Sequence, residues 1–150
     1  MSQTHTVTGA AGQTQASRLA RLRLSSLGLV TMLILEFILG IVYNLYGTAP
    51  TSTKSIGLFS SPVLALHVIV GILLVIAGIG QLIRAIGARD RLTIWMSAVG
   101  LLGILAAGFA GLGFTGSGAA GASLGMSLAF AVSLAAYVVL VFALAPSSTT

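Results

Sequence analysis

The sequence predicts an all-α membrane protein, built as an up-down bundle of four transmembrane helices. Hydrophobic residues make up 57% of the 150 residues and charged residues only 6%, and the mean hydropathy is +1.09. A chain with so few charges cannot cover a core with a wetted surface, so it must dissolve in lipid. The apolar residues form four runs without strand-like alternation, and an open sheet cannot leave its edge in lipid.

The four apolar runs are long enough to cross a bilayer as helices. A helix rises by about 1.5 Å per residue, so about 20 residues span a hydrocarbon core of about 30 Å. N-cap signals precede the second and third runs, and helix breakers follow the second and fourth: Ser61 with Pro62, Asp90, Gly87 and Pro146. We therefore expect helices over residues 27–46, 63–86, 92–114 and 119–145.

The segments outside the bundle of residues 27–146 are short. Residues 1–17 are small and polar, so they cannot bury enough surface to offset the entropy of ordering, and we expect a disordered cytoplasmic tail. Residues 18–26 form a basic juxtamembrane segment, which acts either as a topology signal or as a short helix lying on an anionic leaflet. Residues 147–150 form a second short cytoplasmic tail.

Positive charges favour one side of the bundle. Six of the seven basic residues precede the first helix or surround the turn between the second and third: Arg18, Arg21, Arg23, Arg84, Arg89 and Arg91. Only Lys54 lies in the loop of residues 47–61. By the positive-inside rule, we expect a multi-pass protein of the cell membrane with both termini cytoplasmic. A cleaved signal peptide is the alternative, but the first apolar run exceeds the usual apolar region of about 7 to 15 residues.

Several function classes find no support in the sequence. The basic residues flank apolar runs, so the expected partner is the lipid bilayer, with other membrane subunits or a homo-oligomer, and no nucleic acid. The absence of cysteine excludes disulfides, thiolate nucleophiles, iron–sulfur ligation and covalently attached haem. No local arrangement of serine, histidine and acid, no metal-ligand cluster and no paired carboxylates is apparent, which favours a non-catalytic protein over an enzyme.

Small residues recur at four-residue spacing on the third and fourth helices. Such stripes let backbones approach in lipid, so we expect two of them to face each other. They consist of Gly103, Ala107 and Gly111 on one helix and Ala119, Ser123, Ser127, Ala131 and Ala135 on the other. Gly121 and Gly125 form an adjacent G-x-x-x-G, for which a contact inside the bundle is favoured over a dimer.

Glu36 lies in the middle of the first apolar run and is one of only two acidic residues. Helical spacing places it on one face with Gly40, Tyr43, Asn44 and Gly47. The second helix repeats this pattern with His67, Gly71, Leu74, Gly78 and Gln81. Counted from the intervening loop, Glu36 and His67 differ in depth by about 7 Å. We expect them to meet directly or through Asn44, Tyr43 or a water molecule.

Three interpretations of Glu36 and His67 stay open. In the first, Glu36 is protonated and the pair is a buried polar lock in a complex subunit or self-associating bundle. In the second, a proton- or ion-linked membrane protein uses Glu36 as the titrating group and His67 as its partner. A charge at the bilayer centre costs at least about 2.5 to 3.5 kcal/mol, so an ionisable residue kept inside the membrane is by default a functional candidate. In the third, His67 is an axial ligand of haem b. His5 lies in the tail, so bis-histidine ligation would require a dimer.

Four segments carry a resemblance to a family: "EFILGIVYNLYG", "HVIVG", "GFAGLGF" and "SLGMSLAFAVSLAAY". In these the chain resembles small four-helix membrane proteins of prokaryotes that have no assigned function. The resemblance implies a shared bundle in which Glu36, Asn44, His67 and Tyr137 form one polar constellation, and it implies no activity. The chain lacks the paired histidines by which di-haem quinone-oxidising bundles are known.

Overall fold

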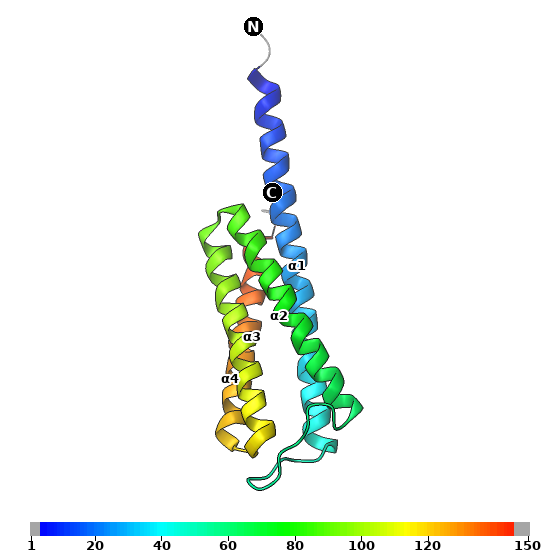
Figure 1. Ribbon diagram of the computed structural model, residues 1–150. Coiled ribbons are helices and arrows are strands. Elements are labelled where there is room, and N and C mark those ends of the chain that lie inside the picture. The colour runs from blue at the N-terminus through cyan, green and yellow to red at the C-terminus, as the bar shows by residue number, and fades with distance from the viewer. Residues whose placement is uncertain (1–3, 146–150) are drawn as a thin grey trace.

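The protein folds as an all-α bundle of four helices, as the sequence predicts (Figure 1). The computed structural model describes residues 4–145, with side chains described from residue 15, so the predicted tail of 147–150 lies outside this range. The helices are α1 (Thr4–Tyr46), α2 (Pro62–Ala88), α3 (Arg91–Ser117) and α4 (Ala120–Ala143). All four are long and apolar enough to cross a membrane.

Local chemistry explains where α2 and α3 begin. Ser61 accepts a hydrogen bond from Leu64 N at 3.2 Å, and Pro62 supplies a first helical residue that needs no N–H partner. Asp90 caps α3 by accepting from Thr93 N at 2.8 Å. Both predicted N-caps are therefore confirmed.

The predicted end of α2 at Gly87 is wrong, because the helix continues through Ala88. The left-handed residue that ends it is Arg89, with φ of 58°, whose N–H donates to Ile86 O. Gly118, with φ of 66°, makes the corresponding turn between α3 and α4. A side chain at Gly118 would be strained, and its Cβ would also lie 2.5 Å from Pro50 O.

The N-terminal region differs from the disordered tail expected for residues 1–17. In the structure α1 begins at Thr4 and continues without interruption through the juxtamembrane residues 18–26. Its first turns extend beyond the other helices (Figure 1). A helix already nucleated inside the bundle gains one hydrogen bond for each residue added, so propagation needs no hydrophobic contact of its own.

The four helices form a closed ring in which α1 contacts α2 and α4, and α3 contacts α2 and α4. Arg18, Arg21 and Arg84 line one pocket beside the turn between α2 and α3, and we call this end of the bundle the basic end. The loop of residues 47–61 and the turn between α3 and α4 lie at the other end, the loop end (Figure 1). There Ile56 N donates to Thr115 O at 3.0 Å.

The core lies in the half of the bundle nearer the basic end. Buried residues of α3 fall between Thr93 and Ile104, and those of α4 between Ser133 and Leu140. The main apolar cluster consists of Leu29, Leu33, Val70, Leu74, Ile104, Tyr137 and Leu140. Toward the loop end, α1 and α4 still touch through Phe37 and Phe130, whose rings stack with centroids 5.4 Å apart.

Close backbone packing joins α3 to α4, but with a different face of α4 from the predicted one. A Cβ at Gly103 would overlap Ser133 Oγ and lie 2.8 Å from Ala129 O. Gly111 faces Met126, and Gly125 faces Ala110, which is the contact inside the bundle expected for Gly125. The predicted residues Ser127, Ala131 and Ala135 are exposed on the opposite side of α4, and a Cβ at Gly121 would meet no atom within 4 Å.

Candidate functional site

The structure brings Glu36 of α1 and His67 of α2 together. Glu36 Oε1 lies 3.3 Å from His67 Nδ1, and the two side chains are 13% and 25% exposed. The atoms do not align as a hydrogen bond, and neither Nδ1 nor the second oxygen, Glu36 Oε2, has a hydrogen-bond partner among residues 15–145. The pair is thus a close contact of two polar side chains at the edge of the bundle.

Two glycines make room for this pair. A Cβ at Gly71 would lie 3.1 Å from Glu36 Oε1, and a Cβ at Gly40 would lie 3.5 Å from His67 Cε1. Each polar side chain therefore lies against a glycine of the opposite helix. The glycines that share faces with Glu36 and His67 in the sequence let the two helices approach at this level.

The pair belongs to a regular antiparallel register between α1 and α2. His67 lies beside Gly40, Gly71 beside Glu36, and further along Gln81 Nε2 donates to Ser26 Oγ at 2.9 Å. The intervals between these positions are equal on the two helices. Glu36 lies beside Gly71, which is one helical turn, or about 5.4 Å, from His67 on α2. The side chains of Glu36 and His67 are long enough to cover this difference in depth.

Three other residues expected in the polar constellation lie elsewhere. The Tyr43 hydroxyl donates to Thr48 O at 3.1 Å, at the start of the loop. Asn44 is exposed on α1. Tyr137 is completely buried, with its ring and hydroxyl between Gly78 and Gly100. Gly78 is about two helical turns along α2 from Gly71, so Tyr137 does not reach Glu36.

The sequence does not reveal a second set of buried polar atoms nearer the basic end. Gln81 Oε1, Ser97 Oγ and the Tyr137 hydroxyl are buried and have no hydrogen-bond partner among the described side chains and backbone. Ser97 lies one turn from Gly100 on α3, and Gln81 one turn from Gly78 on α2. The sequence gives a reason to expect Gln81 inside the bundle, because Gln81 shares a helix face with His67. It gives no such reason for Ser97, which is an ordinary small residue in an apolar helix.

The described residues provide few ligands for a cofactor or metal ion. No group of three or more His, Cys, Asp or Glu residues among them is placed to hold a metal. His67 is the one histidine whose side chain is described, because His5 lies in the part of α1 without described side chains. A single imidazole with a neighbouring carboxyl group can exchange a proton, hold a hydrogen bond or supply one axial ligand.

Comparisons with protein-family models, with curated proteins and with solved structures give no match for this chain.

Proposed function

We propose that this chain is a non-catalytic integral membrane protein, a complex subunit or self-associating bundle, in which Glu36 and His67 form a buried polar lock between α1 and α2. The observation that carries this proposal is the 3.3 Å approach of Glu36 Oε1 to His67 Nδ1. Both termini are cytoplasmic in this proposal, because six basic residues lie at or beside the basic end and Lys54 lies in the loop at the other.

A polar lock has a clear physical use in this bundle. Lipid is as apolar as leucine, so apolar side chains contribute little to choosing one register of two neighbouring helices over another. A carboxyl group and an imidazole favour the few registers in which they can meet, because every other register leaves both without a partner. With Glu36 protonated and His67 neutral, the pair avoids the cost of a charge in the membrane and leaves two groups able to share a hydrogen bond.

The outward face of α4 supports an associating protein. Ser127, Ala131 and Ala135 recur at four-residue spacing and are exposed. A small residue that faces lipid is no more favourable than leucine, whereas a small residue that faces another helix lets that helix approach closely. A second copy of this chain, presenting the same face of α4, would satisfy that spacing.

A proton- or ion-linked role is the second candidate, and one observation favours it. Glu36 Oε2 is buried without a hydrogen-bond partner among the described residues, while the neighbouring His67 side chain is 25% exposed. A carboxyl group with an unused oxygen beside a partly exposed imidazole can take up and release a proton. The haem b interpretation rests on His67 alone and has no such support.

A double-mutant cycle tests the lock. Glu36→Gln should be tolerated, because a neutral amide still forms hydrogen bonds. Glu36→Leu and His67→Leu should each lower the free energy of unfolding by about 1 to 3 kcal/mol, since each leaves one partner buried alone. The double apolar variant should recover part of this loss. Asn44→Leu is the matched control, because it removes an exposed polar group of α1 that forms no hydrogen bond with His67 in the structure.

Other outcomes would replace the lock with another function. Additive losses in the double variant would mean that Glu36 and His67 act independently. A Soret band of the purified protein that is lost in His67→Leu and kept in Glu36→Leu would establish haem ligation. A folded Glu36→Gln variant that no longer supports proton-coupled uptake into proteoliposomes would establish the proton-linked role.

A further inference from the structure

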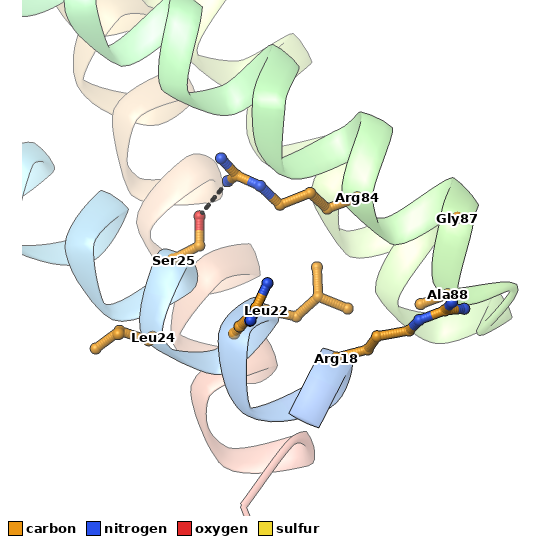
Figure 2. A pocket seen from close by; sticks show the side chains of 8 residues that line it. Arg18, Leu22, Leu24, Ser25, Arg84, Gly87 and Ala88 are labelled. Carbon is orange, nitrogen blue, oxygen red and sulfur yellow. Dashed lines mark hydrogen bonds between the residues drawn. The ribbon is translucent and has the colours of Figure 1, made fainter. Parts of the chain in front are cut away.

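The basic end carries an open pocket between α1 and α2 that is independent of Glu36 and His67. Its volume is about 790 Å³, and its lining combines three arginines with apolar and small side chains: Arg18, Arg21, Arg84, Leu22, Leu24, Ser25, Gly87 and Ala88. Figure 2 shows Arg18 reaching from α1 toward Ala88 of α2, while Arg84 reaches from α2 toward Ser25 of α1. The pocket is therefore lined by cations from both helices.

Arg84 is held in place across this pocket. Its Nη1 donates to Ser25 Oγ at 3.0 Å. The guanidinium also folds back along α2, because a Cβ at Gly80 would lie 3.9 Å from both Nη1 and Nη2. A guanidinium has five N–H donors, and the bond to Ser25 uses one of them in the described part of the chain. The remaining donors are available to a ligand with several acceptor oxygens.

Among the described residues, no Asp or Glu side chain forms an ion pair with the arginines of this pocket. The sequence holds only two acidic residues, Glu36 and Asp90. Glu36 faces His67 several turns away, and Asp90 caps α3. Hydrogen bonds from the hydroxyl and N–H of Thr93 hold the pKa of Asp90 below its ordinary value, so Asp90 is an anion at neutral pH, but it forms no ion pair with Arg18, Arg21 or Arg84 in the described part of the chain. Three arginines against this single anion leave the pocket with a net positive charge, with apolar side chains beside it.

The depth of Arg84 matches the boundary between lipid chains and headgroups. The 27 residues of α2 extend over about 40 Å, so with α2 centred on a hydrocarbon core of about 30 Å the helix reaches about 5 Å beyond the core at each end. Arg84 lies four residues, or about 6 Å, from the end of α2 at Ala88. A phosphate group at the depth of Arg84 lies beside that side chain, whereas Arg21 and Arg18 lie further from the bilayer centre.

We propose that this pocket binds the phosphodiester headgroup of an anionic glycerophospholipid, with Arg84 donating hydrogen bonds to the phosphate and Arg18 adding positive charge further out. Arginine favours phosphate because its planar guanidinium can donate two parallel hydrogen bonds to two oxygens. The acyl chains of the lipid descend beside the exposed side chain of Leu24, which is 71% exposed. A free phosphate ion shares the headgroup chemistry but has no use for this apolar flank.

Native mass spectrometry of the detergent-purified protein tests this proposal with dioleoylphosphatidylglycerol, dioleoylphosphatidylcholine and inorganic phosphate as probes. Wild-type protein should retain the anionic lipid at least about fivefold more tightly than the zwitterionic one. The Arg18→Gln/Arg84→Gln variant should lose about fivefold in affinity for the anionic lipid per arginine removed. Arg89→Gln/Arg91→Gln is the matched control, because it removes two charges near the same end from residues outside the pocket lining.

The outcomes distinguish binding in this pocket from a non-specific attraction of anionic lipid to the basic end. Equal losses in the two double variants, or equal retention of both lipids by the wild type, would overturn the proposal. Displacement of the anionic lipid by millimolar phosphate would show that the pocket is a free-anion site and overturn the lipid assignment. If the pocket variant loses its helical circular dichroism, Ser25→Ala takes its place, because it removes only the anchor of Arg84. It should weaken anionic lipid binding and leave zwitterionic lipid binding unchanged.

Discussion

Gly103 is the position where a single added methyl group should most clearly test the packing of α3 on α4. A Cβ there would overlap Ser133 Oγ and would lie 2.8 Å from Ala129 O and 3.2 Å from Ser133 N. Carbon atoms prefer neighbours at about 3.5 to 4.0 Å, so the helices would have to separate by about 0.5 to 1 Å. Because two of these three atoms belong to the backbone of α4, a rotamer change cannot relieve the contact.

The expected cost of Gly103→Ala follows from three contributions. Overpacking of this kind costs about 1 to 3 kcal/mol. Separation of the helices also weakens the hydrogen bond that Ser133 Oγ donates to Gly100 O at 3.0 Å, a loss of about 1 kcal/mol. Replacing glycine by alanine in a helix returns about 1 kcal/mol. The net expectation is a decrease of about 1 to 3 kcal/mol in the free energy of unfolding.

Reversible unfolding in mixed micelles of a mild detergent and sodium dodecyl sulfate measures this change. Gly108→Ala is the matched control, because the same substitution on the same helix meets no atom within 4 Å and should leave the protein unchanged or slightly more stable. Gly103→Ala combined with Ser133→Ala should recover only part of the loss, since Ala129 O stays in place. If Gly103→Ala is as stable as the Gly108 control, α3 and α4 do not pack through this contact and the helix pairing is incorrect.

Two further predictions concern topology and association. The chain has no cysteine, so single cysteines can be introduced without background. In intact cells an impermeant maleimide should label Thr53→Cys and leave Ala88→Cys unlabelled, and the reverse pattern would invert the proposed orientation. Ala131→Cys should form a disulfide-linked dimer in oxidised membranes more readily than Leu102→Cys, which is 65% exposed on α3. Equal cross-linking of both variants would count against a dimer through α4.

The sequence predicts the helices and the Glu36–His67 contact because both depend on simple periodicities. Apolar runs of membrane-spanning length define the spans, and spacing of three or four residues places Glu36 and His67 beside glycines on matching faces. The end of α2 at Arg89 was missed because Gly87 gives a similar signal. The predicted start of α1 is wrong because the composition of the first residues does not show that a helix already formed in the bundle extends into them.

The predicted packing face of α4 is wrong for a different physical reason. In a soluble helix, polar residues mark the side away from the core, but both sides of a membrane helix are apolar. On α4 small residues occupy both sides: Ala129 and Ser133 pack toward α3, while Ser127 and Ala131 are exposed. Small-residue spacing alone therefore identifies two candidate faces and does not choose between them.

Different interactions hold α1 against α2 and α3 against α4, and this difference bears on what the polar lock does. Between α3 and α4, Gly103 and Gly111 allow close approach, and a side chain brought to the place of Gly103 would overlap Ala129 or Ser133. Among residues 15–145, the contacts of α1 with α2 are instead marked by polar side chains at separate levels: Glu36 with His67, Ser26 with Gln81, and Ser25 with Arg84.

Without these polar contacts, the α1–α2 interface would be largely aliphatic and would tolerate a shift of one helical turn at little cost, because lipid and neighbouring leucines provide equivalent surroundings. The loss of Glu36 or His67 should consequently affect the uniqueness of the α1–α2 register as well as the free energy of unfolding. The contact of Arg84 with Ser25 sets the same register at the basic end. A phospholipid headgroup bound by Arg84 at this contact would therefore reinforce from the membrane surface the alignment that Glu36 and His67 maintain within it.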